Sequence, residues 1–249
     1  MQIFNALLPT LVGVLALTAI GTAVLAWYGV PHRWAPLFAI LRGVVQLSVL
    51  SIILTGVITS GFWVGVALAV MFTIAVFTST RRIGWSWNHA LLIGSAMALG
   101  ISVTLGIVFL TGAIEFSARY ALAIGGIVIG NAMTVATLTG RNINDVVADH
   151  WEDVEGWLAI GATPRQSTLE LGRRAIYNAL VPSIDQTKTT GLVALPGAFV
   201  GAIFGGVSPL EAGRFQIVVL ASIMAAGAIT AVVGTWWLAP MKLKPVSLT

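Results

Sequence analysis

The chain alternates long apolar segments with short polar ones, and most of the apolar segments hold no charged side chain. A helix of about 20 apolar residues is long enough to cross the hydrocarbon layer of a bilayer. The pattern therefore predicts an all-α integral membrane protein, a single transmembrane domain over residues 1–249 with about seven transmembrane helices. The expected spans are residues 6–28, 35–58, 61–80, 90–112, 119–139, 189–207 and 215–239.

The sixth expected span, 189–207, is short and rich in glycine and includes Pro196. It is either a complete crossing or a kinked or re-entrant helix, which would leave six crossings. Glycines spaced four residues apart allow close helix packing, within the chain or between two copies of it. Such glycines are Gly126 and Gly130 in the fifth span and Gly197, Gly201 and Gly205 in the sixth.

One segment, residues 141–188, holds five of the 13 Lys and Arg residues and seven of the nine Asp and Glu residues. From Ile143 to Leu158 its apolar residues recur at spacings of three and four, which predicts an amphipathic helix over 143–160. The segment is expected to be a cytoplasmic region that protrudes from the membrane. The alternative is that its acidic helix is a solvated cap over the bundle.

Helix signals divide this segment further. Gly161 is expected to end the first helix, and Pro164 to stand at the start of a second helix over 165–180. Pro182 is then expected to stop the second helix before the chain re-enters the membrane. A further pattern within the second helix predicts an i,i+4 ion pair between Glu170 and Arg174.

The basic residues predict the orientation, because Lys and Arg are retained on the cytoplasmic side of a membrane. With seven spans and the N-terminus outside, ten of them fall inside and only Arg119 and Arg214 outside, while Arg42 in the second span can reach the inner surface. The expected topology is therefore N-out/C-in. The ten inner residues are Arg33, Arg81, Arg82, Arg141, Arg165, Arg173, Arg174, Lys188, Lys242 and Lys244.

Composition excludes several classes of function. Charged residues make up 9% of the chain, against about 25% in soluble domains, and the basic residues form no patch that would bind nucleic acid. There is no cysteine, and no Asp or Glu lies in the seven expected spans, which disfavours a proton-coupled carrier. No phosphate-binding loop is present. The chain is therefore not expected to be an enzyme or to bind a cofactor, and any ATP must bind a second polypeptide.

A few polar residues interrupt the expected spans. Arg42 and Gln46 lie one helical turn apart in the second span, and Asn131 lies near the middle of the fifth. Polar groups inside a membrane face the bundle or a water path. They are therefore candidate pathway residues, or else they hydrogen-bond neighbouring helices together.

The sequence VEGWLAIGATPRQ at 154–166 resembles the coupling loop of ABC transporter permeases, in which Glu is followed by two small residues, three others and Gly. Glu155 and Gly161 match that spacing, although Gly156 and Trp157 replace the two small residues. More widely, the chain resembles the FetB/YbbM-type ABC transporter permease family. The motifs that carry this resemblance are GNAM at 130–133, VPSID at 181–185, GLVALPG at 191–197 and FQIVV at 215–219.

This resemblance implies a multi-pass permease subunit of the inner (plasma) membrane, assigned to iron export and oxidative-stress resistance. It implies a homodimer of the permease with two ABC ATPase subunits, which bind the ATP and Mg²⁺. The residues expected to contact the ATPase are Glu155, Trp157, Ile160, Gly161, Ala162 and Thr163. Arg42, Gln46, Asn131 and Asp185 are the candidate pathway residues, and Asp185 is also the candidate metal ligand unless it caps a turn or pairs with Lys188.

More than one cargo and more than one energy source fit the sequence. A plant relative is proposed to move a UDP-sugar, so a nucleotide sugar is a second possible cargo, with Arg42 meeting its phosphate. The family tends to carry Met and a polar or sulfur-bearing residue after LPG, whereas this chain has Ala198, Phe199 and Ala202. Two further hypotheses are an ATP-independent secondary carrier or channel, and a membrane scaffold that moves nothing.

Overall fold

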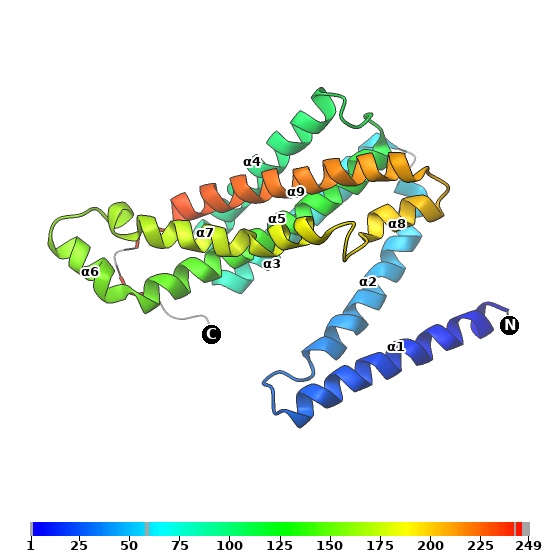
Figure 1. The fold of residues 1–249 in the computed structure, drawn as a ribbon, viewed down its shortest axis with the longest axis horizontal. Coiled ribbons are helices and arrows are strands. Elements are labelled where there is room, and N and C mark those ends of the chain that lie inside the picture. Colours follow the sequence, from blue (N-terminus) through cyan, green and yellow to red (C-terminus); the bar gives the residue numbers. More distant parts are fainter. Residues whose placement is uncertain (1, 58–59, 242, 246–249) are drawn as a thin grey trace. The chain divides into compact units, whose positions relative to one another are not determined.

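The computed structural model describes residues 2–57, 60–241 and 243–245, and these residues form nine helices and no strand. The prediction of an all-helical chain is therefore confirmed for this part. Lys242 and residue 58, the end of the second expected span, lie outside the described residues. The helices are α1 Gln2–Trp27, α2 Ala35–Val57, α3 Gly61–Ile83, α4 Trp87–Leu110, α5 Ala118–Asp149, α6 Trp151–Ala159, α7 Pro164–Thr189, α8 Gly197–Phe204 and α9 Pro209–Leu238 (Figure 1).

Five of the described helices are long and apolar enough to cross a membrane, namely α1 from Leu8 onward, α3, α4, α5 and α9. The apolar part of α2, Ala35–Ser51, is shorter. The chain divides into two compact units, residues 1–59 and residues 60–249. In the first unit α1 packs against α2, and the Thr22 hydroxyl donates to the Thr18 carbonyl at 2.8 Å.

The second unit is built around α9, which packs against α4, α5, α7 and α8, while α3 packs against α4 and α5. Its main core joins apolar side chains from α3, α4, α5 and α9. Met97, Ile124 and Val128 are completely buried there. In each candidate span less than half of the residues are buried, so much of the apolar surface stays exposed, as in a helix that faces lipid.

The expected helix over 143–160 is divided between two helices. α5 continues past the fifth expected span to Asp149, and α6 begins at Trp151. The predicted apolar face is correct at Ile143, Val147 and Val154, which are all completely buried in a second core cluster with Leu171. Buried apolar residues stand both before and after His150, so α5 and α6 pack on the same core cluster although they are separate helices.

The end predicted for the following helix at Pro182 is wrong, because α7 contains Pro182 and continues to Thr189. Pro182 is exposed, and it removes one backbone donor from the helix. At 26 residues, α7 is about 39 Å long. It runs back along α5 and α9, away from α6 (Figure 1). Residues 141–188 are thus shared between α6 with its turns and two long helices of the bundle.

A continuous helix over 189–207 is also wrong. Thr189 is the last residue of α7, residues 190–194 form a turn closed by an isolated bridge between Thr190 and Ala194, and of the residues after it, up to 207, only Gly197–Phe204 is helical. These eight residues span about 12 Å, whereas the hydrocarbon layer is about 30 Å thick. The kinked or re-entrant alternative fits this short helix better than a complete crossing does.

Candidate functional site

The first candidate site is the knuckle, which we define as residues 151–166: α6, the turn after it and the first turn of α7. The turn depends on Gly161, whose φ of +93° is strained for any residue with a side chain. The Ala162 amide donates to the Trp157 carbonyl at 3.0 Å. Thr163 then caps α7 through a reciprocal capping box with Gln166, and Pro164 occupies the first turn. The expected helix–turn–helix is confirmed.

The knuckle is fixed to the bundle on one side and exposed on the other. Val154 is completely buried against α5 and α7, whereas the side chains of Trp157 and Ile160 are 56% and 76% exposed. Trp157 therefore does not belong to the buried face on which its spacing placed it. Glu152, Asp153 and Glu155 are exposed around it. The six candidate coupling residues lie together on this projection: Glu155, Trp157, Ile160, Gly161, Ala162 and Thr163.

Two pockets flank the knuckle. The first has a volume of about 470 Å³ and lies between α6 and α7, with Asp153, Trp157 and Arg174 in its lining. The second, about 450 Å³, follows the turn past Ile160 and Gly161. The expected Glu170–Arg174 pair is wrong, because Glu170 instead pairs with Arg173 at 3.3 Å. The surface thus combines exposed apolar side chains with carboxylates, as surfaces that bind another protein do.

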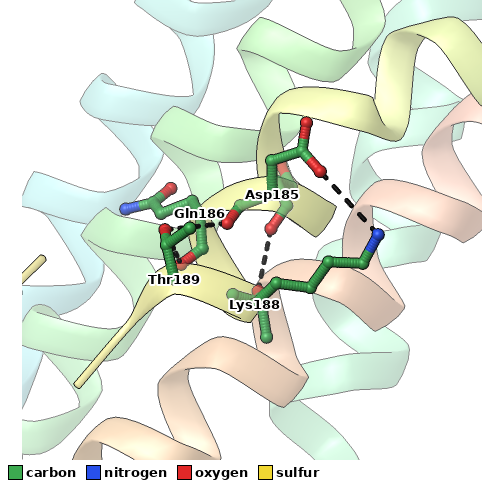
Figure 2. A network of polar contacts seen from close by, with 6 residues as sticks. Asp185, Gln186, Lys188 and Thr189 are labelled. Atoms are coloured by element: carbon green, nitrogen blue, oxygen red, sulfur yellow. Dashed lines mark hydrogen bonds and ion pairs between the residues drawn. The ribbon is translucent and has the colours of Figure 1, made fainter. Parts of the chain in front are cut away.

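The second candidate site is Asp185 near the end of α7. Its carboxylate pairs with Lys188 at 3.8 Å, and the two side chains are 63% and 69% exposed. The Thr189 hydroxyl donates to the Asp185 carbonyl at 2.9 Å (Figure 2). Asp185 is therefore a partner of Lys188 and not a helix N-cap. Among the described residues no three His, Cys, Asp or Glu side chains gather as a metal site would require.

The register of α7 on α9 sets the depth of Asp185 in the bundle. The Thr168 hydroxyl donates to the Ala239 carbonyl at 2.9 Å, and a Cβ on Gly227 would lie 3.4 Å from Leu180 Cδ2. The later residue of α7 contacts the earlier residue of α9, so the two helices are antiparallel. Continuing the register brings Asp185 level with residue 222, near the middle of α9. Asp185 lies near the end of α7 and the knuckle at its start, so the two are far apart along the helix.

The polar residues of the spans belong to different units of the chain. Asn131 is half-buried on α5, and its Nδ2 donates to the Ile127 carbonyl of the same helix at 2.9 Å. A hydrogen bond between helices comes instead from Thr137, whose hydroxyl donates to the Ser79 hydroxyl at 3.1 Å. Arg42 and Gln46 are exposed on α2 in the first unit, whereas Asn131 and Asp185 belong to the second.

The glycine motifs are only partly used for close packing. Of the predicted glycines, Gly126 approaches another helix, because a Cβ there would lie 3.1 Å from Met71 Cε, whereas Gly130, Gly197 and Gly201 have open space. A Cβ on Gly205 would meet only the backbone of α8. A closer helix approach is at Gly100, which the predicted glycine motifs do not include. Its four-residue spacing from Ala96 is the signal that could have found it.

Comparison with known proteins gives consistent matches. The model of an uncharacterised protein family, UPF0014, matches residues 8–241. The UPF0014 membrane protein STAR2 of Oryza sativa subsp. japonica is 38% identical over 202 residues, 80% of this chain and 71% of that protein. The Arabidopsis thaliana protein ALUMINUM SENSITIVE 3 is 35% identical over 202 residues, 80% of this chain and 74% of its own.

A bacterial relative has a function in its name. The probable iron export permease protein FetB of Escherichia coli (strain K12) is 34% identical over 141 residues, 57% of this chain and 54% of that protein. The resemblance found in the sequence motifs is therefore confirmed. No solved structure matches the chain. The family matches and the long apolar helices together show a multi-pass membrane protein.

Proposed function

Because the chain belongs to the UPF0014 family of membrane proteins, we propose that it is the permease subunit of an ABC transporter, driven by a separate ATPase that binds ATP and Mg²⁺. The observation that carries this proposal is the knuckle. Its Trp157 and Ile160 residues are 56% and 76% exposed, and burying the apolar surface of an exposed Ile against a partner contributes at most about 1.5–3 kcal/mol. The knuckle thus offers the ATPase a rigid apolar contact with a carboxylate rim.

The attachment of the knuckle explains how force on it would reach the membrane helices. Val154 lies in one core cluster with Ile143 of α5, Leu171 of α7 and Ala239 beyond α9. Close-packed interiors transmit displacement instead of absorbing it. ATP-driven movement of the ATPase would therefore turn α5, α7 and α9 together, and ATP on the partner would favour one of two permease states.

We also propose that α7 replaces residues 189–207 as a membrane crossing. Its length is sufficient, and it lies along two candidate spans, α5 and α9. The number of crossings stays at seven, so the N-out/C-in topology predicted from Lys and Arg is kept. Lys188, counted inside in that prediction, is by the same register level with residue 219 of α9 and then lies within the membrane. The hydropathy of α7 is too low to mark it as a membrane span, because its sequence is polar.

A polar crossing needs water or protein beside it, because lipid does not satisfy charged groups. The face of α7 that includes Arg174, Tyr177, Asn178, Asp185 and Gln186 is exposed. We place the cargo pathway along this face, closed by the same face of a second permease copy in a homodimer with two ATPases. Asp185, level with the middle of α9, then supplies a carboxylate within the pathway.

Iron is the leading cargo, and a relative named as a probable iron export permease supports it. One Asp185 carboxylate provides too few ligands for iron, but a homodimer would bring two to the pathway. A nucleotide sugar remains the second candidate, because Arg174 and Lys188 would attract its phosphates. Asp185→Asn should abolish iron movement and leave ATPase binding intact. If an anionic cargo moves instead, Lys188→Gln should have the larger effect.

The test of coupling is co-expression of the chain with an ABC ATPase and reconstitution of both in lipid vesicles. Ile160→Ser should lower co-purification of the ATPase and ATP-dependent iron movement at least tenfold, as expected for a central interface residue. Leu110→Ser is the matched control, because Leu110 is 90% exposed at the end of α4 that leads into the start of α5, opposite α6. Equal effects of the two substitutions, or uphill transport by the permease alone, would refute the proposal.

A further inference from the structure

A groove of about 430 Å³ runs between the first half of α7 and the last turns of α9. Its walls are mainly apolar and include Leu169 and Ile176 from α7 and Val232 from α9. Leu169 and Val232 are exposed there. Because α9 is a candidate membrane span, this groove lies along the surface of a membrane helix. It shares Gln166 and Leu169 with the pocket at the turn of the knuckle and extends from there along α7 and α9. It does not include Asp185.

Two arginines line the groove, and one of them, Arg165, lies at its end. Arg165 Cζ lies 4.2 Å above the ring centroid of Trp236, which joins the start of α7 to the end of α9. Arg173 also lines the groove, and it bonds Glu170, one turn closer to the start of α7. Its charged end is therefore directed toward the end where Arg165 lies. The groove is apolar along its length and basic at one end.

The tryptophans at the end of α9 indicate where the basic end of the groove lies relative to the bilayer. Trp236 and its neighbour Trp237 stack edge to face with 5.2 Å between ring centroids, and tryptophans gather at the headgroup level of a bilayer. The basic end of the groove therefore lies where lipid phosphates are found.

We propose that this groove binds an anionic phospholipid. One acyl chain lies along Leu169, Ile176 and Val232, and the phosphate group meets Arg165 and Arg173. Basic pockets between membrane helices select anionic headgroups in this way, and Arg holds phosphate with two parallel hydrogen bonds. Glu170 is displaced from Arg173 by the phosphate and remains exposed to water. The lipid joins the start of α7, next to the knuckle, to the end of α9.

The experiment measures lipid retained by the full-length chain in native mass spectrometry after release from mixed micelles. The micelles contain phosphatidylglycerol or phosphatidylcholine with the same acyl chains. The wild type should bind one phosphatidylglycerol about tenfold more tightly than phosphatidylcholine. The double substitution Arg165→Gln with Arg173→Gln should remove this preference. Val232→Trp, which fills the groove without changing charge, should reduce retention of both lipids.

The matched control is Arg81→Gln with Arg82→Gln, because both residues are exposed at the end of α3 and the charge change is the same. The control should keep the wild-type preference for phosphatidylglycerol. Equal loss in the control and the groove variant would overturn the proposal by showing general attraction. Displacement of the lipid by soluble glycerol phosphate at equal concentration would also overturn it, because the acyl chain would then contribute nothing. Cross-linking of Leu169 to a second copy of the chain would overturn it as well, because a protein and not a lipid would then occupy the groove.

Discussion

A close approach between α4 and α9 lies at Gly100, and it allows a quantitative test of the packing in the second unit. A Cβ added at Gly100 would lie 2.7 Å from the Ala226 carbonyl oxygen and 2.7 Å from Thr230 Oγ1. The carbonyl belongs to the backbone of α9, so it cannot rotate away as a flexible side chain would. Gly100→Ala therefore forces α4 and α9 apart.

The free energy of unfolding should change in opposite directions at two glycines of α4. Overpacking a close contact costs about 1–3 kcal/mol, whereas replacing a helical Gly by Ala gains about 0.5–1 kcal/mol. Gly106 lies in the same helix and has no atom within 4 Å of an added Cβ. Gly106→Ala should therefore stabilise the protein slightly. Both variants gain the same free energy from replacing a helical Gly by Ala. The difference between their unfolding free energies therefore measures the steric cost at Gly100 alone, about 1–3 kcal/mol.

The assay is thermal unfolding of the detergent-solubilised chain followed by tryptophan fluorescence. For a chain of this size each kcal/mol shifts the midpoint by about 2–4 °C. Gly100→Ala should melt several degrees below Gly106→Ala, with the wild type between them or close to the control. If Gly100→Ala melted at or above the temperature of Gly106→Ala, the close packing of α4 on α9 would be incorrect.

Three further predictions concern α6 and α7. Thr168→Val removes the buried hydroxyl that donates to the Ala239 carbonyl and should lower the unfolding free energy by about 1–3 kcal/mol, measured by the same melts; an unchanged midpoint would contradict the contact. Gly161→Ala should lower the unfolding free energy by about 1 kcal/mol or more, because Gly161 has a positive φ. Gly156→Ala in α6 is the control and should not destabilise the protein, because no atom lies within 4 Å of an added Cβ there. Equal melting midpoints for the two variants would argue against the turn. Asp185→Asn should change the unfolding free energy by less than about 0.5 kcal/mol, because its ion pair is exposed, so that a large loss of stability would show a structural role.

The knuckle could be predicted from the sequence because its signals are local. Gly161, Pro164 and the apolar residues from Ile143 to Val154 act within a few helical turns of one another. The candidate coupling residues are therefore adjacent in the sequence and adjacent in the structure. The exposure of Trp157 was not predictable in the same way, because spacing alone does not tell which edge of an apolar face meets the bundle.

The lipid groove and the depth of Asp185 depend on helices distant in sequence. Leu169 and Ile176 form an apolar stripe on α7 that periodicity could have shown, but its partner residues on α9, such as Val232, lie far along the chain. The register between α7 and α9 follows from contacts such as Thr168 with Ala239. No pattern within either helix determines that register.

By itself the sequence determined the all-helical membrane class, the family and the position of the knuckle, because hydropathy, helix signals and motifs are properties of short segments. Only the tertiary structure decided that α7 continues through Pro182 to Thr189 along α5 and α9, and that residues 189–207 hold one short helix. A polar helix resembles a soluble segment until its neighbours are known. The packing of Ala175, Ala179 and Leu171 against α5 and α9 makes α7 part of the bundle, and hydropathy averaged along one segment does not detect such contacts.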